Sequence, residues 1–179
     1  MNAHGALFLL LLAAAGVGAE TARFASVELT DERTRLLISR TDGSVVAAPM
    51  QVDQDSFDKP AISADGGYAG WLALYPNRGA SYSQPLGLVV LDARNHTHHF
   101  AGTFGMVFEW CFAPGADAVV YTYSFPHGRT PTGFDMRRIK DERLLHRAIV
   151  EPKLTSAGVQ EVDAAVPHWA NCLHTASAR

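Results

Sequence analysis

The sequence predicts an all-β protein built from antiparallel four-stranded units. Past residue 20, short runs rich in β-branched and aromatic residues, such as "YAGWLALY" and "AVVYTYSF", alternate with turns rich in Gly, Pro, Asp and Asn. Helical periodicity is confined to a short stretch around residues 141–150. A shift of the chain by 50 residues also aligns one predicted hairpin with another. These observations favour repeated β-hairpins over a mixed fold.

Length and charge limit the domain count and the classes of partner. The chain has 179 residues, of which 47% are hydrophobic and 18% are charged, and its formal net charge is −3. This composition is typical of a single globular domain with a sizeable core. Nucleic-acid binding needs clustered Lys and Arg, so the near-neutral balance argues against a nucleic-acid partner.

Residues 1–19, "MNAHGALFLLLLAAAGVGA", predict a signal peptide. The apolar run from Leu7 to Ala15 is too short to span a bilayer as a helix, and small residues up to Ala19 provide a cleavage site. A short membrane anchor is the alternative, because no Lys or Arg precedes the run. We expect cleavage after Ala19 and a periplasmic or secreted protein, with a β-repeat domain at 20–150 and a C-terminal connector and docked tail at 151–179. The protein would then contact the membrane only through the signal peptide, before its cleavage.

The 50-residue shift places "ISADGGYAGWLALYPN" on "FAPGADAVVYTYSFPH". Trp71 meets Tyr121 and Ala73 meets Tyr123, so the matches fall on alternate residues and share one face of a strand. Upstream, "LLISRTDGSVV" is similar to "LVVLDARNHTH", as if a half-unit preceded the first full unit. We read about two and a half copies of a stacked unit. An unrelated β-sandwich with similar hairpins is the alternative.

The segment "KPAISADGGYAGWLA" resembles the repeat of TolB-type β-propellers, which carries a Pro-x-x-Ser-x-Asp-Gly-x-x-x-x-aromatic pattern. The matching residues are Pro60, Ser63, Asp65, Gly66 and Trp71. The resemblance covers residues 36–147, although in the second copy Ala113-Pro114-Gly115 replaces the Ser-Pro-Asp-Gly core of the family pattern. It implies a β-propeller-like fragment that is incomplete as a closed ring in one chain. Either the sheets form an open body, or several chains complete a ring as a homo-oligomer.

The resemblance implies binding rather than catalysis, with an envelope protein or peptide as the partner. The sequence contains neither a Gly-x-Ser-x-Gly elbow nor a phosphate-binding Gly loop. The run "DMRRIKDER", residues 135–143, mixes signs and predicts an exposed strand and turn. We therefore predict a non-catalytic interaction module of the cell envelope, with no catalytic residue and no cofactor.

Two long loops that follow the aromatic strands, residues 75–87 and 125–134, are the candidate binding surface. Equivalent loops of stacked units gather on one edge, and loops on a rigid scaffold often carry function. The alternative is that they are stiff connections without a binding role. The candidate residues are Asn77, Arg78, Ser81, Tyr82, His127 and Arg129.

His96 and His98 suggest an alternative function as a metal-binding protein or metal-dependent enzyme. Two residues apart, they share one face of an extended segment and can bind zinc or copper if a third ligand joins them. No third ligand is identifiable, and polar surface is the other interpretation of the pair.

Cys111 and Cys172 are the two cysteines of the chain. In an oxidising compartment an even pair predicts a disulfide, here one that attaches the C-terminal tail to the body. Two buried free thiols are the alternative. We expect Trp169 and Cys172 to hold the tail against the body of the protein. The alternative is that Trp169 is exposed and binds a partner.

Overall fold

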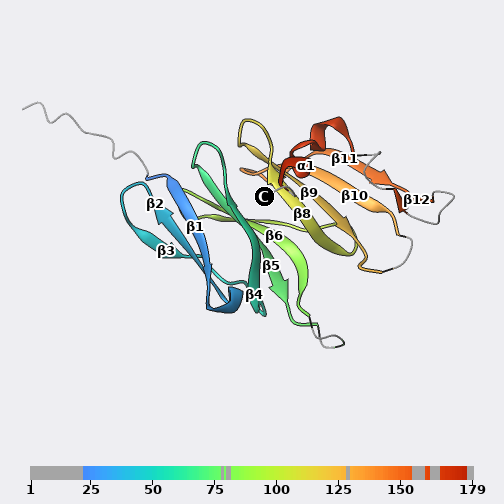
Figure 1. The fold of residues 1–179 in the computed structure, drawn as a ribbon. Helices are drawn as coiled ribbons and strands as arrows, with labels where there is room; N and C mark the ends of the chain where they lie inside the picture. Colours follow the sequence, from blue (N-terminus) through green and yellow to red (C-terminus); the bar gives the residue numbers. More distant parts are fainter. Residues whose placement is uncertain are drawn as a thin grey trace, which may run out of the picture.

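The computed structural model describes residues 22–77, 79, 82–127, 130–154, 160–161 and 166–176, and shows an all-β protein (Figure 1). The predicted leader, residues 1–19, lies outside the described residues. Antiparallel meanders form stacked sheets in chain order, open rather than closed into a ring. The predicted fold class, an incomplete propeller-like fragment, is confirmed. Among the described residues, no helix is both long enough and apolar enough to cross a membrane.

Three main sheets contain eleven of the strands. The N-terminal sheet has β1 (Phe24–Thr30), β2 (Arg35–Arg40) and β3 (Val45–Ala47), with a short 3-10 turn η1 (Asp31–Arg33) between β1 and β2. The central sheet has β4 (Ser56–Ile62), β5 (Tyr68–Tyr75), β6 (Gln84–Asp92) and β7 (Thr97–Phe100). The C-terminal sheet has β8 (Met106–Phe112), β9 (Ala118–Ser124), β10 (Thr132–Arg138) and β11 (Leu144–Val150).

The remaining elements are short and belong to the tail. They are the pair β12 (Lys153–Leu154) and β13 (Gln160–Glu161), the 3-10 turn η3 (His168–Ala170) and the helix α1 (Cys172–Ala176). Most of the stretch with helical periodicity, from residue 144 to residue 150, forms β11, because pairing with β10 overrides its local pattern.

The central and C-terminal sheets repeat each other in backbone detail at a spacing of 50 residues. Before β5, Gly66 N donates to Ser63 O at 2.9 Å, and before β9, Ala116 N donates to Ala113 O at 3.0 Å. β4 and β8 each contain a bulge opposite the middle of the following strand. The similarity seen in the sequence therefore reflects two copies of one four-stranded unit.

The N-terminal sheet is a third, shorter copy. In the β2–β3 hairpin, Gly43 N donates to Arg40 O at 3.0 Å, and in the β6–β7 hairpin, Asn95 N donates to Asp92 O at 2.9 Å. Gly43 and Asn95 both have positive φ, at 84° and 68°. The predicted half-unit is the β2–β3 hairpin, which corresponds to β6–β7. The structure adds β1 to it, in the place that β5 has in the central sheet.

The two faces of the central sheet contribute to different cores. Trp71 packs toward the N-terminal sheet with Phe57 and Ile38, whereas Leu72 packs toward the C-terminal sheet with Tyr121. A third core covers the outer face of the C-terminal sheet, where the tail packs on β8, β9 and β10. Stacking therefore supplies the burial that one four-stranded sheet cannot achieve alone.

Trp71→Ala should destabilise the protein by about 3–5 kcal/mol, because it removes a large aromatic side chain from the first core. Trp71 is fully buried, and its ring lies 6.1 Å from that of Phe57. Trp71→Phe is the matched control and should cost less, because Trp71 Nε1 is buried without a hydrogen-bond partner among the described residues. Urea unfolding measures both changes. A Trp71→Ala protein as stable as the wild type would contradict this packing role.

The equivalent turns before β5 and β9 predict opposite effects of exchanging glycine and alanine. Gly66 has φ 70°, and a Cβ there would lie 2.8 Å from Phe24 O, so Gly66→Ala should destabilise by more than about 1 kcal/mol. Ala116 holds φ 60° with a side chain present, so Ala116→Gly should stabilise by up to about 1 kcal/mol. Thermal unfolding compares the two variants with the wild type. The same sign of change in both would contradict the shared turn geometry.

Candidate functional site

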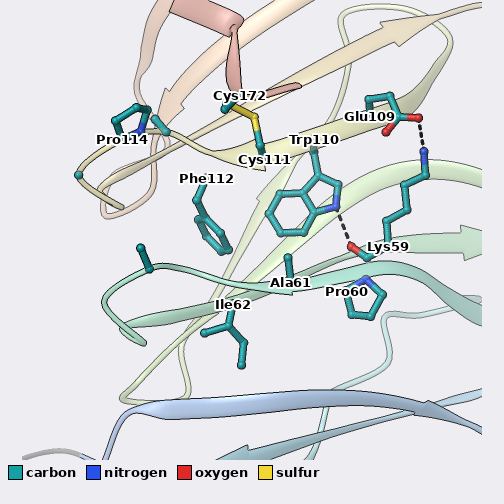
Figure 2. Close-up of a pocket in the computed structure, with 13 residues that line it drawn as sticks. Lys59, Pro60, Ala61, Ile62, Glu109, Trp110, Cys111, Phe112, Pro114 and Cys172 are labelled. Carbon is teal, nitrogen blue, oxygen red and sulfur yellow. Dashed lines mark hydrogen bonds and ion pairs between the residues drawn. A yellow bond between two sulfur atoms is a disulfide. The ribbon is translucent and has the colours of Figure 1, made fainter. Parts of the chain in front are cut away.

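A groove of about 930 Å³ runs between β4 of the central sheet and β8 of the C-terminal sheet (Figure 2). Both strands are edge strands of their sheets. The turns that follow them, each before the second strand of its unit, extend the walls. The lining is mostly apolar and includes Pro60, Ala61, Ile62, Phe112 and Pro114.

An ion pair between Lys59 and Glu109 lies toward the opposite end of the groove from Pro114 (Figure 2). Lys59 Nζ also donates to Phe108 O at 2.8 Å. Both charged side chains are more than one-third exposed, at 39% and 37%. The pair neutralises itself, so the groove has little net charge of its own.

Trp110 connects the two edges from within. Its Nε1 donates to Lys59 O at 3.0 Å, and the residue is 4% exposed. The indole also packs on Gly70 of β5, where a Cβ would lie 2.6 Å from Trp110 Cη2. The groove therefore has a fixed floor, and its accessible surface is supplied by the smaller residues around Trp110.

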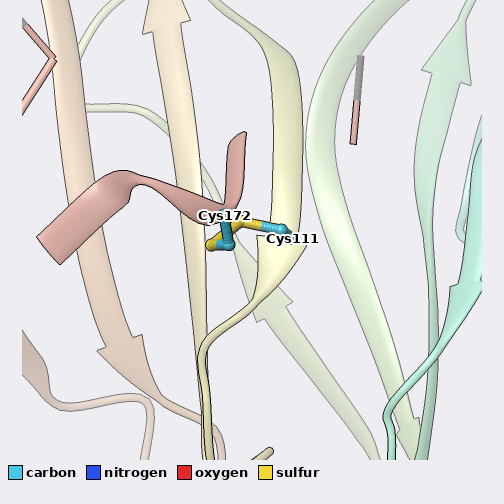
Figure 3. The surroundings of a disulfide bond; sticks show 2 residues. All are labelled: Cys111 and Cys172. Carbon is cyan, nitrogen blue, oxygen red and sulfur yellow. A yellow bond between two sulfur atoms is a disulfide. The ribbon is translucent and has the colours of Figure 1, made fainter. Parts of the chain in front are cut away.

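A disulfide forms part of the wall of the groove and attaches the tail (Figure 3). Cys111 on β8 is bonded to Cys172 at the start of α1, with a Cα–Cα distance of 6.0 Å, as the sequence predicts. Trp169 stacks on His146 at a ring distance of 5.6 Å, and Ala170 is fully buried. Trp169 thus packs the tail against the C-terminal sheet, in agreement with the expectation from sequence.

The two long loops predicted as a binding surface meet at one edge. Tyr82 Oη lies 3.3 Å from His127 Nε2, although the two residues are 45 positions apart. Tyr82 and Phe125 are 48% and 51% exposed, and Asn77 Oδ1 accepts from Gly79 N within its own loop. A binding role for these loops remains a prediction. The other candidate residues, Arg78, Ser81 and Arg129, lie outside the described residues.

His96 and His98 have separate carboxylate partners. His96 Nδ1 is 3.2 Å from Asp92 Oδ2 in its own hairpin, and His98 Nδ1 is 3.8 Å from Glu142 Oε1 in the next sheet. His96 is 69% exposed, whereas His98 is 14% exposed. Across the described part of the chain, no three His, Cys, Asp or Glu side chains gather in a group that could hold a metal ion. A metal site at this pair remains a prediction.

A buried polar cluster centred on Asp135 was missed by sequence reasoning. Asp135 on β10 is fully buried, as is Ile139, so the expectation of an exposed strand and turn at residues 135–143 is wrong for these two residues. Arg147 donates to both of its oxygens at 2.7 Å, Tyr123 Oη donates at 3.1 Å, and Tyr121 Oη and Arg137 Nε at 3.3 Å. An Asp in mid-strand between apolar residues is disfavoured unless it is paired, which is the signal that the sequence offered.

The cluster fixes protonation states as well as positions. Burial opposes ionisation of Asp135, but the hydrogen bond and charge of Arg147 outweigh it and hold the pKa of Asp135 below its ordinary value. Burial, reinforced by the charge of Asp135, raises the pKa of Tyr121. Burial also raises the pKa of Tyr123. The phenols therefore remain hydrogen-bond donors at neutral pH, and the cluster joins β9, β10 and β11.

Comparisons with known proteins identify no family. No family model matches the sequence, and none of the curated proteins matches it. Among solved structures, the chain is similar to the Pyrococcus horikoshii acylaminoacyl peptidase, with a TM-score of 0.43 and 11% identity. The alignment covers 73% of this chain and 25% of the peptidase, so the chain spans about a quarter of that protein's length.

Asp135→Asn should destabilise the protein by about 3 kcal/mol, because Arg147 would lose its buried counter-ion. The folded-state pKa of Asp135 is depressed, so its contribution is complete above the ordinary pKa of about 4 and is lost as pH falls through the folded pKa. The wild type should therefore lose stability in acid more steeply than the variant does. Urea unfolding at several pH values measures the difference.

The matched control for this experiment is Asp141→Asn. Asp141 pairs with Arg138 on the surface and should contribute little, because solvent screens exposed pairs. Parallel loss of stability in acid by the wild type and Asp135→Asn would contradict the assignment to Asp135.

Proposed function

We propose that this chain is an exported, non-catalytic interaction module of the cell envelope that binds a peptide segment of a partner protein in the groove between β4 and β8. The observation that carries the proposal is the groove itself, an apolar channel between two strand edges held by Trp110 and the Cys111–Cys172 disulfide. A site on rigid elements loses little entropy on binding. The resemblance of the repeat to TolB-type propellers, whose members bind envelope proteins or peptides, supports the same class of function.

The chemistry of the groove indicates how a peptide would be recognised. Bulges interrupt β4 between Asp58 and Ala61 and β8 between Val107 and Trp110, so neither edge offers a long regular ladder to a new strand. Recognition should therefore depend on an apolar side chain inserted toward Phe112 and its neighbours. Because the Lys59–Glu109 pair is self-neutralised, we expect an uncharged anchor residue.

Peptides selected from a random display library against the chain starting at Glu20 test this proposal. Ala64→Arg places a long charged side chain at the exposed rim of the groove and should weaken selected peptides by about tenfold or more. Ala47→Arg is the matched control, because Ala47 is also exposed but lies on β3. Isothermal titration calorimetry measures both affinities.

Equal affinities of the selected peptides for wild type and Ala64→Arg would exclude the groove as the site. A photo-crosslinker at position 64 should also capture the peptide, and one at position 47 should not. The export part of the proposal is tested separately by N-terminal sequencing of the protein from the envelope fraction, which should begin at Glu20.

A further inference from the structure

Among the described residues, the N-terminal sheet has no counterpart of the strand that begins each of the other two units. β5 and β9 are each flanked by a preceding strand, β4 and β8, whereas β1 is an edge strand. Among the residues that the structure describes, no strand pairs with the outer edge of β1. In the described part of the chain, the same unit thus occurs twice with its first strand and once without it.

The backbone groups along this edge can be assigned from neighbouring hydrogen bonds. Ala48 N donates to Leu36 O at 2.8 Å, so Leu36 and alternate residues of β2 face β3, and the residues between them face β1. Leu37 therefore bonds with its partner Glu28. The N–H and C=O groups of Val27 and Leu29 then point to the open edge, and no hydrogen bond from another described element reaches them.

The side chains of β1 are also incompletely covered. Val27 and Leu29 are half-buried, although their paired neighbours Ile38 and Leu36 are fully buried. In the central unit Leu72 is the counterpart of Leu29, and it is 1% exposed. A strand beside β1 would supply the missing cover on both the backbone and the apolar side.

We propose that β1 accepts an extended strand from a partner protein, which completes the N-terminal sheet by antiparallel strand addition. β4 and β8 each have seven residues, which sets the length of the segment. The equivalent inward positions hold Ala61 and Cys111, so small apolar side chains should face the central sheet. The outward positions should be polar, because the exposed Ser26 and Glu28 lie beside them.

This surface goes beyond the groove and is chemically distinct from it. β1 pairs with β2 without interruption from Ser26 to Thr30, so its edge is regular where β4 and β8 are bulged. Backbone hydrogen bonds can therefore provide affinity at β1, with side-chain pockets providing specificity. A partner that fits both surfaces would bind at two separate places.

The test uses a synthetic peptide with the sequence of residues 55–63, the segment that the fold itself places beside β5, and a scrambled peptide of the same composition. Added to the chain starting at Glu20, the first peptide should slow amide exchange of Val27 and Leu29 about tenfold or more, and the scrambled one should not. This measurement needs no variant. It therefore remains decisive if a substitution in β1 prevents folding.

Two proline variants then locate the site. Val27→Pro removes an N–H that points to the open edge and should weaken the peptide about tenfold. Val45→Pro is the matched control, because Val45 faces the opposite edge on β3, and it should leave affinity unchanged. Ala64→Arg in the groove should also leave it unchanged, which separates this proposal from the preceding one.

Three results would overturn the proposal. One is unchanged exchange at Val27 and Leu29 in the presence of the peptide. Another is protection of these amides in the full chain without peptide, which would mean that residues 1–19 cover the edge. The third is a peptide-free dimer that protects the same amides and dissociates on dilution, detected by light scattering.

Discussion

Trp71 and Leu72 are neighbours in the sequence, yet their side chains belong to two different hydrophobic cores. The central sheet is covered on both faces, and residues Ala69 to Ala73 of β5 are buried without interruption. Exposure of either face of such a strand to water would cost free energy, because both faces are apolar. The N-terminal and C-terminal sheets therefore provide the apolar cover that the two faces of the central sheet need. Each of the three sheets shares a hydrophobic core with its neighbour in the stack.

The groove results from the same repetition. The bulge in β4 sets both Lys59 and Pro60 opposite a single residue of β5, and Lys59 adopts a φ of 46°. Its carbonyl is then available to Trp110, which directly follows the bulge of β8 and pairs with Tyr121. Bulges that differ by one residue in their position in the repeat thus lie on both strand edges, where the hydrogen bond from Trp110 to Lys59 joins them. The irregularity that interrupts pairing within each sheet connects the sheets to each other.

Sequence patterns predicted the features that depend on local residue types and spacing. They did not predict the features that depend on contacts between residues distant in the sequence. The 50-residue spacing, the turn at Gly66 and the Cys111–Cys172 pair could all be derived from residue types and positions. The burial of Asp135 could not, because it depends on Arg147 arriving from another strand. The groove was also missed, because its walls are strands of two different units. β1 was outside the predicted half-unit, since its open edge leaves a mixed polar and apolar pattern typical of a surface strand.

The disulfide determines which part of the molecule opens first. It encloses β9, β10 and β11 in a covalent loop between Cys111 and Cys172, which are 61 positions apart. A chain end is ordinarily the cheapest part of a protein to unfold, but the oxidised tail cannot peel away from the C-terminal sheet. Of the three main sheets, the N-terminal one would then give a protease its first access, because no described strand covers the outer edge of β1. In a reducing environment this constraint is lost, and the tail can then separate from the third core, in which Ala170 is buried.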